Sequence, residues 1–317
     1  MSSPSKPNLI YIASIGRSGT TLLDSMLGAH SDVVTVGEFE IWPHEIRGGG
    51  VRAGSCGESV LRCPVWTEVR RRVDPMTQPP PRLDAFRETH NAGKTLRYRR
   101  LQDFGQGPLS RDLVRQVEQY GANNRALYDA LLDVTEAETG RRPTWIADSS
   151  KDVYRLLWLV RSGHFNVKVL HMVKNPRGFV YSVTKPWLSS GDRLRAPKQM
   201  YYTARQSLAW VARNRLFSAL AERHLDPRAY LLVRYEQLAS EPHETFRRIC
   251  EHVEVPYEAD AVDGFRSGCQ HTIAGNPMRY ETRAIELDER WRTKLPASSR
   301  WLTEVVTAST RSRYGYP

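Results

Sequence analysis

The sequence contains no hydrophobic run long enough to cross a membrane. Its longest uninterrupted apolar stretch, about Leu156–Val160, is LLWLV, whereas a membrane-spanning helix needs ~20 apolar residues. The opening residues MSSPSKPN also lack the charged and then apolar regions of a secretory signal. These absences predict a cytoplasmic protein without a membrane span.

Lysine is scarce in this basic chain. Eight of the 46 basic residues are lysines, and the formal net charge is +11. Excess positive charge favours an anionic ligand or loose affinity for polyanions. Because an arginine excess can reflect genome composition, the charge alone carries little weight. A lysine that follows a strand is therefore the more informative residue.

Metal-binding cysteine patterns are also missing. The four cysteines are Cys56, Cys63, Cys250 and Cys269; none forms a C-x-x-C pair, and no histidine cluster completes a zinc pattern. Cys56 and Cys63 lie in a glycine-rich stretch that leaves a disulfide or a weak metal site open. Reduced structural thiols are the favoured interpretation for a cytosolic protein, and we expect no metal requirement.

The alternation of strand and helix patterns predicts an α/β fold. With 317 residues, 40% of them hydrophobic, the chain can bury one large core, or one core plus a small insertion. The patterns predict strands at Asn8–Ser14, Val33–Val36, Thr144–Ala147, Val167–Val173 and Ala229–Arg234, with helices at Thr20–Ala29, Tyr154–Arg161, Met200–Glu222 and Pro242–Val253. Such alternation favours a P-loop-like three-layer fold: a mostly parallel central sheet flanked by helices on both faces.

One stretch departs from this alternation. Residues from about 43 to 125 contain the runs GGG and PPP and many arginines. We interpret them as an insertion or lid within a single domain over residues 1–317. The insertion is expected to be partly helical near Leu113–Leu132 and to help form a substrate site, because loops on a rigid scaffold usually carry specificity.

A glycine turn joins the first predicted strand to the first helix. It consists of Gly16, Arg17, Ser18, Gly19, Thr20 and Thr21. Glycines let backbone N–H groups surround an anion, and the helix N-terminus adds further donors. The turn is not a Walker A loop, which would require Gly at 14 and Lys at 20; the sequence has Ser14 and Thr20.

A second candidate anion site follows a later strand. Lys174 ends that strand, and Arg177 and Ser182 lie along the next helix, which Pro176 opens. Two anion-binding strand ends suit a ligand that is phosphorylated at two separate places. A solvated helix start is the alternative interpretation of this segment taken alone.

These segments resemble the sulfotransferases that use 3′-phosphoadenosine-5′-phosphosulfate (PAPS), particularly bacterial members. The first forty residues are also similar to tyrosylprotein sulfotransferases. The resemblance is carried by GRSGTTLL at 16–23, LGAHSD at 27–32, GE at 37–38, VKNPRGFVYS at 173–182, VRYEQL at 233–238 and GNPMR at 275–279. It covers most of the chain outside about 43–125. Lys174 stands where the family usually has arginine, so charge is kept and bidentate geometry is lost.

The resemblance implies how PAPS is held. The backbone of Ser18–Thr21 would bind the 5′-phosphate, while Lys174, Ser182 and Arg279 would bind the 3′-phosphate. Tyr235 would contact the adenine, although a packed tyrosine at a strand end is the alternative. The released product would be 3′-phosphoadenosine-5′-phosphate (PAP), and no metal is expected because protein cations take its place.

The resemblance also implies the catalytic groups. Glu38 is the expected general base for an acceptor hydroxyl or amine, and His44 is the runner-up. Arg17 and Lys151 are the expected cations around the transferring group; an ion pair of Lys151 with Asp148 or Asp152 is the alternative.

Two other classes of function stay open. A P-loop small-molecule kinase would use the same scaffold but would need the missing Walker lysine. A polyanion-binding protein without enzymatic activity would use the net positive charge. Under the favoured interpretation, the partner is a small-molecule, phenolic or carbohydrate acceptor rather than a nucleic acid, and a homodimer is possible.

Overall fold

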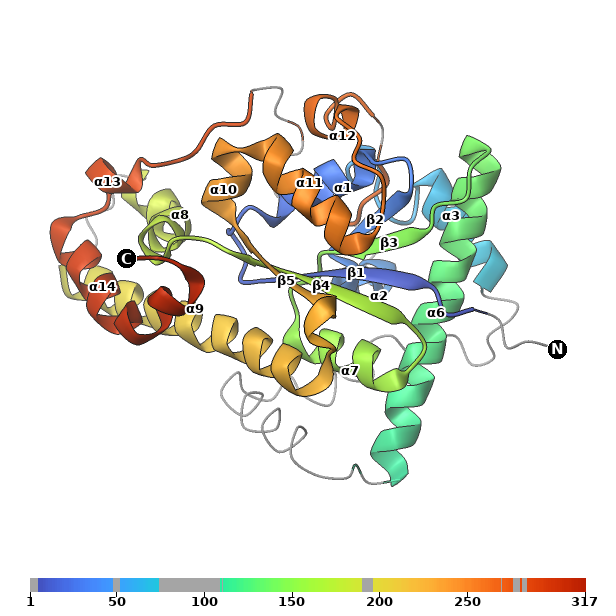
Figure 1. The fold of residues 1–317 in the computed structure, drawn as a ribbon, viewed down its shortest axis with the longest axis horizontal. Helices are drawn as coiled ribbons and strands as arrows, with labels where there is room; N and C mark the ends of the chain where they lie inside the picture. The colour runs from blue at the N-terminus through green and yellow to red at the C-terminus, as the bar shows by residue number, and fades with distance from the viewer. Residues whose placement is uncertain are drawn as a thin grey trace.

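The central element is a five-stranded parallel sheet. The computed structural model describes residues 5–47, 52–73, 109, 111–189, 196–268, 270–275, 280 and 284–317. The strands are β1 (Asn8–Ser14), β2 (Val33–Gly37), β3 (Trp145–Asp148), β4 (Asn166–Val173) and β5 (Tyr230–Arg234). Their spatial order is β2-β3-β1-β4-β5, and every pair is parallel (Figure 1). The predicted α/β class is confirmed.

Helices connect these strands and surround the sheet. They are α1 (Thr20–Ala29), α2 (Trp42–Arg47), α3 (Pro64–Val73), α6 (Arg111–Thr139), α7 (Val153–Ser162), α8 (Pro176–Ser189), α9 (Ala196–His224), α10 (Tyr235–Ser240), α11 (Pro242–Val253), α12 (Asp260–Asp263), α13 (Trp291–Lys294) and α14 (Ala297–Arg311). Short 3-10 turns occur at η1 (Phe39–Ile41), η2 (Pro227–Ala229) and η4 (Ser312–Tyr314). Within the described residues, no helix is both long and apolar enough to cross a membrane.

The central strand shows why the molecule has three layers. Nearly every residue of β1 is buried, as expected for a parallel strand covered on both faces. Leu9 and Tyr11 pack into a cluster with α6 and α7, while Ile10 and Ile12 pack into another with α1 and α11. Figure 1 shows the two helical layers on opposite sides of the sheet.

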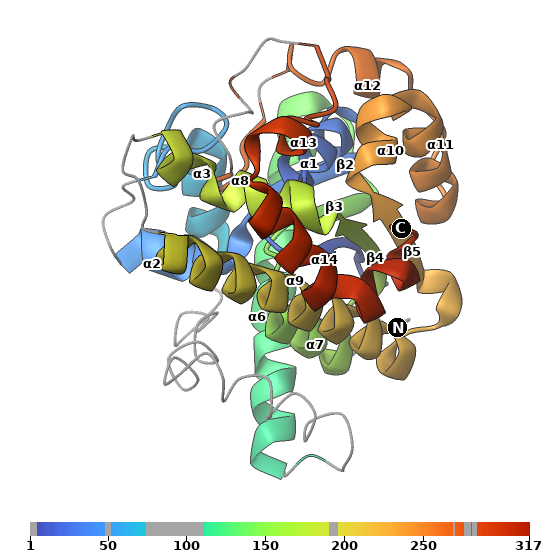
Figure 2. The same cartoon turned by 90° about the vertical axis from the view of Figure 1, so that its left-hand side faces the viewer.

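A third apolar cluster closes one side of the fold. Ile15 and Val173, from the ends of β1 and β4, pack with Trp210 of α9, Trp291 and the C-terminal Tyr316. Figure 2 shows α8, α9, α13 and α14 gathered there. The hydroxyl of Tyr316 donates to the carbonyl oxygen of Val173 at 3.0 Å, so the C-terminus is tied to the end of β4.

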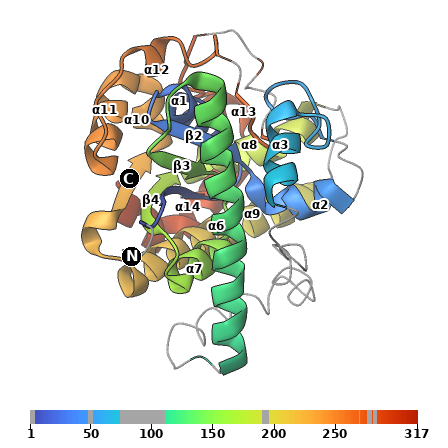
Figure 3. The same ribbon diagram turned by 90° about the vertical axis from the view of Figure 1, so that its right-hand side faces the viewer.

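The segment interpreted as an insertion contributes helices to the opposite side (Figure 3). The ring of Trp66 from α3 contacts Trp42 and Phe39, with centroids 4.8 and 5.8 Å away, and Phe39 contacts Tyr128 of α6 at 5.2 Å. This part therefore shares the main apolar cluster. Residues 74–108 lie outside the described residues, so the lid stays a prediction.

A buried ion pair fixes the end of β3. Asp148 and Arg155 are 0% and 3% exposed, and their side chains meet at 2.8 Å. The Arg155 guanidinium also donates to the hydroxyls of Tyr120 and Tyr128 at 2.7 and 2.6 Å. Because a buried charge is tolerated only when it is paired and hydrogen-bonded, this network holds the loop that follows β3 in one conformation.

Candidate active site

The predicted site residues lie along one edge of the sheet. Glu38 follows β2, Lys151 follows β3, Arg17 follows β1, Lys174 follows β4 and Tyr235 follows β5. Because all five strands are parallel, their carboxyl ends share this edge, which is where open α/β sheets bind ligands. Neighbouring strands lie about 4.8 Å apart, so the row spans roughly 19 Å.

The turn between β1 and α1 has the geometry of an anion cradle. Arg17 and Gly19 have φ angles of 73° and 90°, and α1 begins without a side-chain cap. Its first N–H groups therefore point out of the helix toward a ligand position. The Ser18 hydroxyl is buried and has no hydrogen-bond partner within the described residues. Gly16 belongs to the same turn, and Thr20 and Thr21 begin α1. An oxyanion would satisfy these donors.

Tyr235 connects the turn to the second anion site. A Cβ atom placed on Gly19 would lie 2.3 Å from the Tyr235 ring, so the ring packs directly on the glycine backbone. The Lys174 ammonium lies over the same ring, 4.1 Å from its centroid. The two predicted anion sites are therefore neighbours, bridged by one aromatic ring.

Lys174 is a buried cation that forms no ion pair within the described part of the chain. The residue is 5% exposed, and no carboxylate of the described residues lies within ion-pair distance of it. Its Nζ donates to the Ser182 hydroxyl at 3.3 Å, and Trp210 donates to its carbonyl oxygen at 2.9 Å. Burial lowers the pKa of Lys174, and the charge of Glu236 partly opposes this shift. A bound anion would compensate the buried charge.

Two arginines were also expected near Lys174: Arg177 on the helix of the second anion site, and Arg279 as a ligand of the 3′-phosphate. The Arg177 guanidinium donates to the Pro317 carbonyl oxygen at 2.9 Å and pairs with Glu304 at 3.2 Å. Arg177 therefore fastens the C-terminus instead of facing the site. Arg279 lies outside the described residues, and its predicted contact stays a prediction.

Glu38 and Lys151 form an ion pair. Lys151 Nζ donates to Glu38 Oε1 at 2.7 Å, so neither Asp148 nor Asp152 is its partner. The Glu38 and Lys151 side chains are 25% and 12% exposed, so both are partly accessible to solvent. Lys151 has a φ of 59°, and Arg213 donates to its carbonyl oxygen at 3.5 Å.

The backbone of Glu38 is held by a distant segment. Its N–H donates to the Ile273 carbonyl oxygen at 2.8 Å, and the Ile273 N–H donates to Val36 at 3.0 Å. Gly37 has a φ of 70°, and a Cβ there would lie 2.6 Å from the same carbonyl oxygen. Glycine is needed at this position because the two backbones touch. His44 lies in α2, but its side chain is outside the described part.

A pocket opens beside Tyr235. Its volume is about 310 Å³, and it is lined by Leu22, Arg266 and the segment 284–290. Arg290 donates to both carboxylate oxygens of Asp288 in this segment, at 2.8 and 2.6 Å. The segment 284–290 could not be predicted from the sequence, because it carries no periodic pattern and no recognisable motif.

The fold, together with the residues at the carboxyl ends of the strands, indicates the class of protein. A parallel three-layer sheet with an uncapped helix after β1 is the P-loop-like arrangement, in which anionic ligands bind at the strand ends. The chain matches the model of the Sulfotransferase family over residues 7–259. It therefore belongs to the sulfotransferase family.

Known relatives agree with this family. The chain is 25% identical over 265 residues to mouse (Mus musculus) carbohydrate sulfotransferase 3, covering 77% of this chain and 53% of that protein. It thus spans about half the length of this curated relative.

The solved structures that it resembles share its fold. A sulfotransferase domain from the curacin biosynthetic pathway aligns with a TM-score of 0.57 at 17% identity, covering 99% of each chain. The corresponding domain of the Synechococcus PCC 7002 olefin synthase gives 0.53 at 20% identity, covering 96% of this chain and 97% of that one. Sulfotransferase STF9 from Mycobacterium avium gives 0.54 at 12% identity, covering 99% and 78%.

Proposed function

We propose that the protein transfers a sulfuryl group from PAPS to an acceptor hydroxyl or amine. Glu38 is the general base, Arg17 and Lys151 stabilise the transferring group, and PAP is the second product. The acceptor is a small molecule, with phenols and carbohydrates as the first candidates. The proposed location is the cytoplasm.

The order of residues along the sheet edge carries this proposal. From β2 to β5, the edge presents a carboxylate, two cation positions, a buried lysine and an aromatic ring. PAPS has the matching order of groups: sulfate, 5′-phosphate, 3′-phosphorylated ribose and adenine. The turn at Ser18–Thr21 would hold the 5′-phosphate, and Lys174 with Ser182 would hold the 3′-phosphate. Tyr235 and its neighbouring pocket would receive the adenine end.

The reaction is an in-line displacement at sulfur. The acceptor oxygen or nitrogen attacks the sulfur and forms a new bond, while the bond from sulfur to the 5′-phosphate oxygen breaks. The electron pair of the broken bond goes to the phosphate, and the acceptor proton goes to the Glu38 carboxylate. As in phosphoryl transfer, catalysis depends mainly on positioning and charge stabilisation.

Lys151 can contact the general base and the transferring group at the same time. Its ammonium has three donors, so one can keep Glu38 in place while another contacts a sulfuryl or bridging oxygen. Arg17 is exposed in the turn that follows β1 and supplies a second cation. With these two charges in place, we propose that the step needs no metal ion.

The reaction class is tested with two donors. We expect labelled product from labelled PAPS with a panel of phenols, sugars and amines, no product from labelled ATP, and turnover that is independent of magnesium. Label transfer from ATP but not from PAPS would identify a phosphotransferase. Transfer from neither donor, in a protein that binds polyanions, would favour the non-enzymatic alternative.

Glu38 is tested by a conservative substitution. Glu38→Gln keeps the size of the side chain but cannot accept the proton, so we expect turnover to fall ~100-fold or more while PAP binding is retained. Glu40→Gln, in the same turn, is the matched control and should keep the wild-type rate. If Glu38→Gln is fully active and His44→Ala is inactive, His44 is the base.

A further inference from the structure

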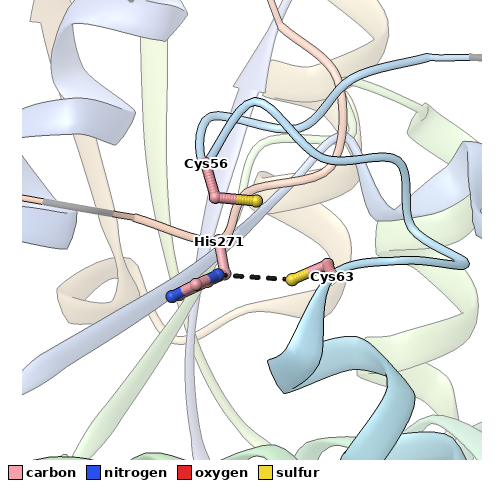
Figure 4. Close-up of side chains that lie close together, drawn as sticks. All are labelled: Cys56, Cys63 and His271. Atoms are coloured by element: carbon pink, nitrogen blue, oxygen red, sulfur yellow. Dashed lines mark hydrogen bonds between the residues drawn. The ribbon is translucent and has the colours of Figure 1, made fainter.

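Three metal-binding side chains meet beside the segment that holds Glu38. Cys56 and Cys63 precede α3, and His271 comes from the segment before Gly275. Their ligand atoms all lie within 4.8 Å of one another, and Cys63 Sγ lies 3.2 Å from His271 Nδ1. Figure 4 shows the three side chains, drawn from two separate segments, gathered around one point.

We propose that Cys56, Cys63 and His271 bind one zinc ion. Thiolate sulfur and imidazole nitrogen are the donors of structural zinc sites. Tetrahedral zinc places such donors about 3.5–3.8 Å apart, so side-chain shifts of about 1 Å bring the cluster to ligand geometry. Zinc binding releases the two thiol protons, and two thiolates then neutralise the ion. The buried position of Cys63 therefore carries no uncompensated charge.

The surrounding backbone is already locked in place. The Ser55 N–H donates to the Thr272 carbonyl oxygen at 3.1 Å, and the Thr272 N–H donates back to the Ser55 hydroxyl at 2.9 Å. The indole of Trp66 donates to the His271 carbonyl oxygen at 2.6 Å. These bonds fix the two segments relative to each other on both sides of the cluster, as a preorganised metal site requires.

The location indicates what the ion does. Ile273, two residues after His271, accepts the Glu38 N–H at 2.8 Å and touches the backbone of Gly37. Zinc would join the Cys56–Cys63 loop to this support, and so would position Glu38 without touching the substrate. The ion is structural, which is compatible with a sulfuryl-transfer step that uses no metal.

A disulfide is the competing arrangement for these cysteines. Both thiols are free in the structure, and the imidazole approaches the thiol of Cys63. A disulfide would consume both sulfurs and leave His271 without this partner. Cys269 lies outside the described residues.

The test measures the metal itself. The full chain is purified without metal-affinity resin or chelator, and its zinc is quantified by mass spectrometry. We expect one zinc per chain. After exchange, Co²⁺ should give thiolate-to-cobalt charge-transfer bands and the visible bands of a tetrahedral site. Because these readouts do not involve sulfuryl transfer, they stand even if the proposed reaction is wrong.

Variants separate the cluster from other thiols. Cys63→Ser and His271→Ala should each lose the bound zinc and the cobalt thiolate bands. Cys250→Ser removes a buried thiol from the opposite face of the sheet and should keep both. Wild-type protein with no zinc and no cobalt spectrum would overturn the proposal even if the variants failed to fold. A mass lower by two hydrogens, with the Cys56–Cys63 pair oxidised, would also overturn it.

Discussion

Two residues proposed to contact the transferring group have an unusual backbone conformation. Arg17 and Lys151 have φ angles of 73° and 59°, and they are two of four described non-glycine residues with positive φ. The left-handed region costs an L-residue roughly 1–2 kcal/mol, and such residues gather at functional sites. At Lys151, the Arg213 contact and the Glu38 ion pair offset this cost. Both residues stand in the turns that directly follow a strand.

Asp24 is a buried carboxyl that makes the stability of the protein depend on pH. This carboxyl of α1 is 6% exposed and accepts the Thr35 hydroxyl at 2.5 Å. Burial raises its pKa to about 6, while the Thr35 hydrogen bond and the charge of Lys151 pull it down. Between about pH 4 and 6, the unfolded state is ionised and the folded state holds a proton. Stability therefore falls as pH rises through this window, by ~3 kcal/mol.

Asp24→Asn removes this titration and keeps an acceptor for Thr35. Relative to wild type, the variant should gain ~3 kcal/mol of unfolding free energy between about pH 4 and pH 8, as urea titrations would measure. His171, whose pKa is lowered to about 4 by burial, also makes stability depend on pH, but its contribution is the same in both proteins and cancels in the difference. That imidazole has the opposite sign, because its contribution is lost as pH falls below about 6.5. A pH-independent difference between the two proteins would contradict the prediction.

The β1–turn–α1 element depends on Gly19. Gly19→Ala places a methyl group 2.3 Å from a Tyr235 ring carbon at a φ of 90°. The ring must move to make room, and we expect this displacement to cost PAP binding about 1–3 kcal/mol of free energy. Calorimetry should therefore show a ~5- to 150-fold higher Kd for PAP. Gly140→Ala is the control, since its φ is 73° with nothing within 4 Å. Both should lose ~1 kcal/mol of stability from backbone strain; equal PAP affinity in the two variants would show that Tyr235 does not support the turn.

Elements with local signals were predicted well. The strand at Asn8–Ser14 and the helices at Thr20–Ala29 and Pro242–Val253 have the predicted bounds, because apolar periodicity and flanking Gly or Pro are local. Strand order is set by contacts between distant segments, and the sequence analysis did not predict it. The glycine- and arginine-rich stretch concealed α3, and α14 was missed as well.

In the site as well, residues with a local sequence signal were predicted, and residues brought together from distant segments were not. The family resemblance, together with positions after predicted strands, named Glu38, Lys151, Arg17, Lys174 and Tyr235. The structure brings these strand ends to one edge, and the roles of the five residues stay predictions. His271 was missed because it lies 208 residues from Cys63, with no spacing pattern to link them. Arg177 was assigned to an anion site, but its partners are the C-terminal Pro317 and Glu304.

At the scale of the whole molecule, net charge and specific recognition must be separated. The formal charge of +11 attracts any anion, and this attraction weakens as salt screens it. Lys174 is different, because it is buried without an acidic partner among the described residues. Only an anion that contacts its ammonium group can offset the desolvation free energy of that charge. Comparing two nucleotides that differ by one phosphate, at physiological ionic strength, isolates the second contribution.

We therefore expect PAP to bind more tightly than AMP, and to raise the thermal unfolding temperature further. A charge-assisted contact contributes about 1.5–3 kcal/mol, which corresponds to ~10- to 150-fold in Kd. Lys174→Met should remove most of the preference for PAP over AMP without changing AMP affinity. Lys168→Met is the matched control: the same residue type on the same strand, paired with Glu254 at 2.6 Å far from the carboxyl edge. If the wild-type protein bound the two nucleotides with equal affinity, the 3′-phosphate would contribute no binding free energy through the buried charge of Lys174. The ends of β1 and β4 would then not bind the two phosphates of one nucleotide.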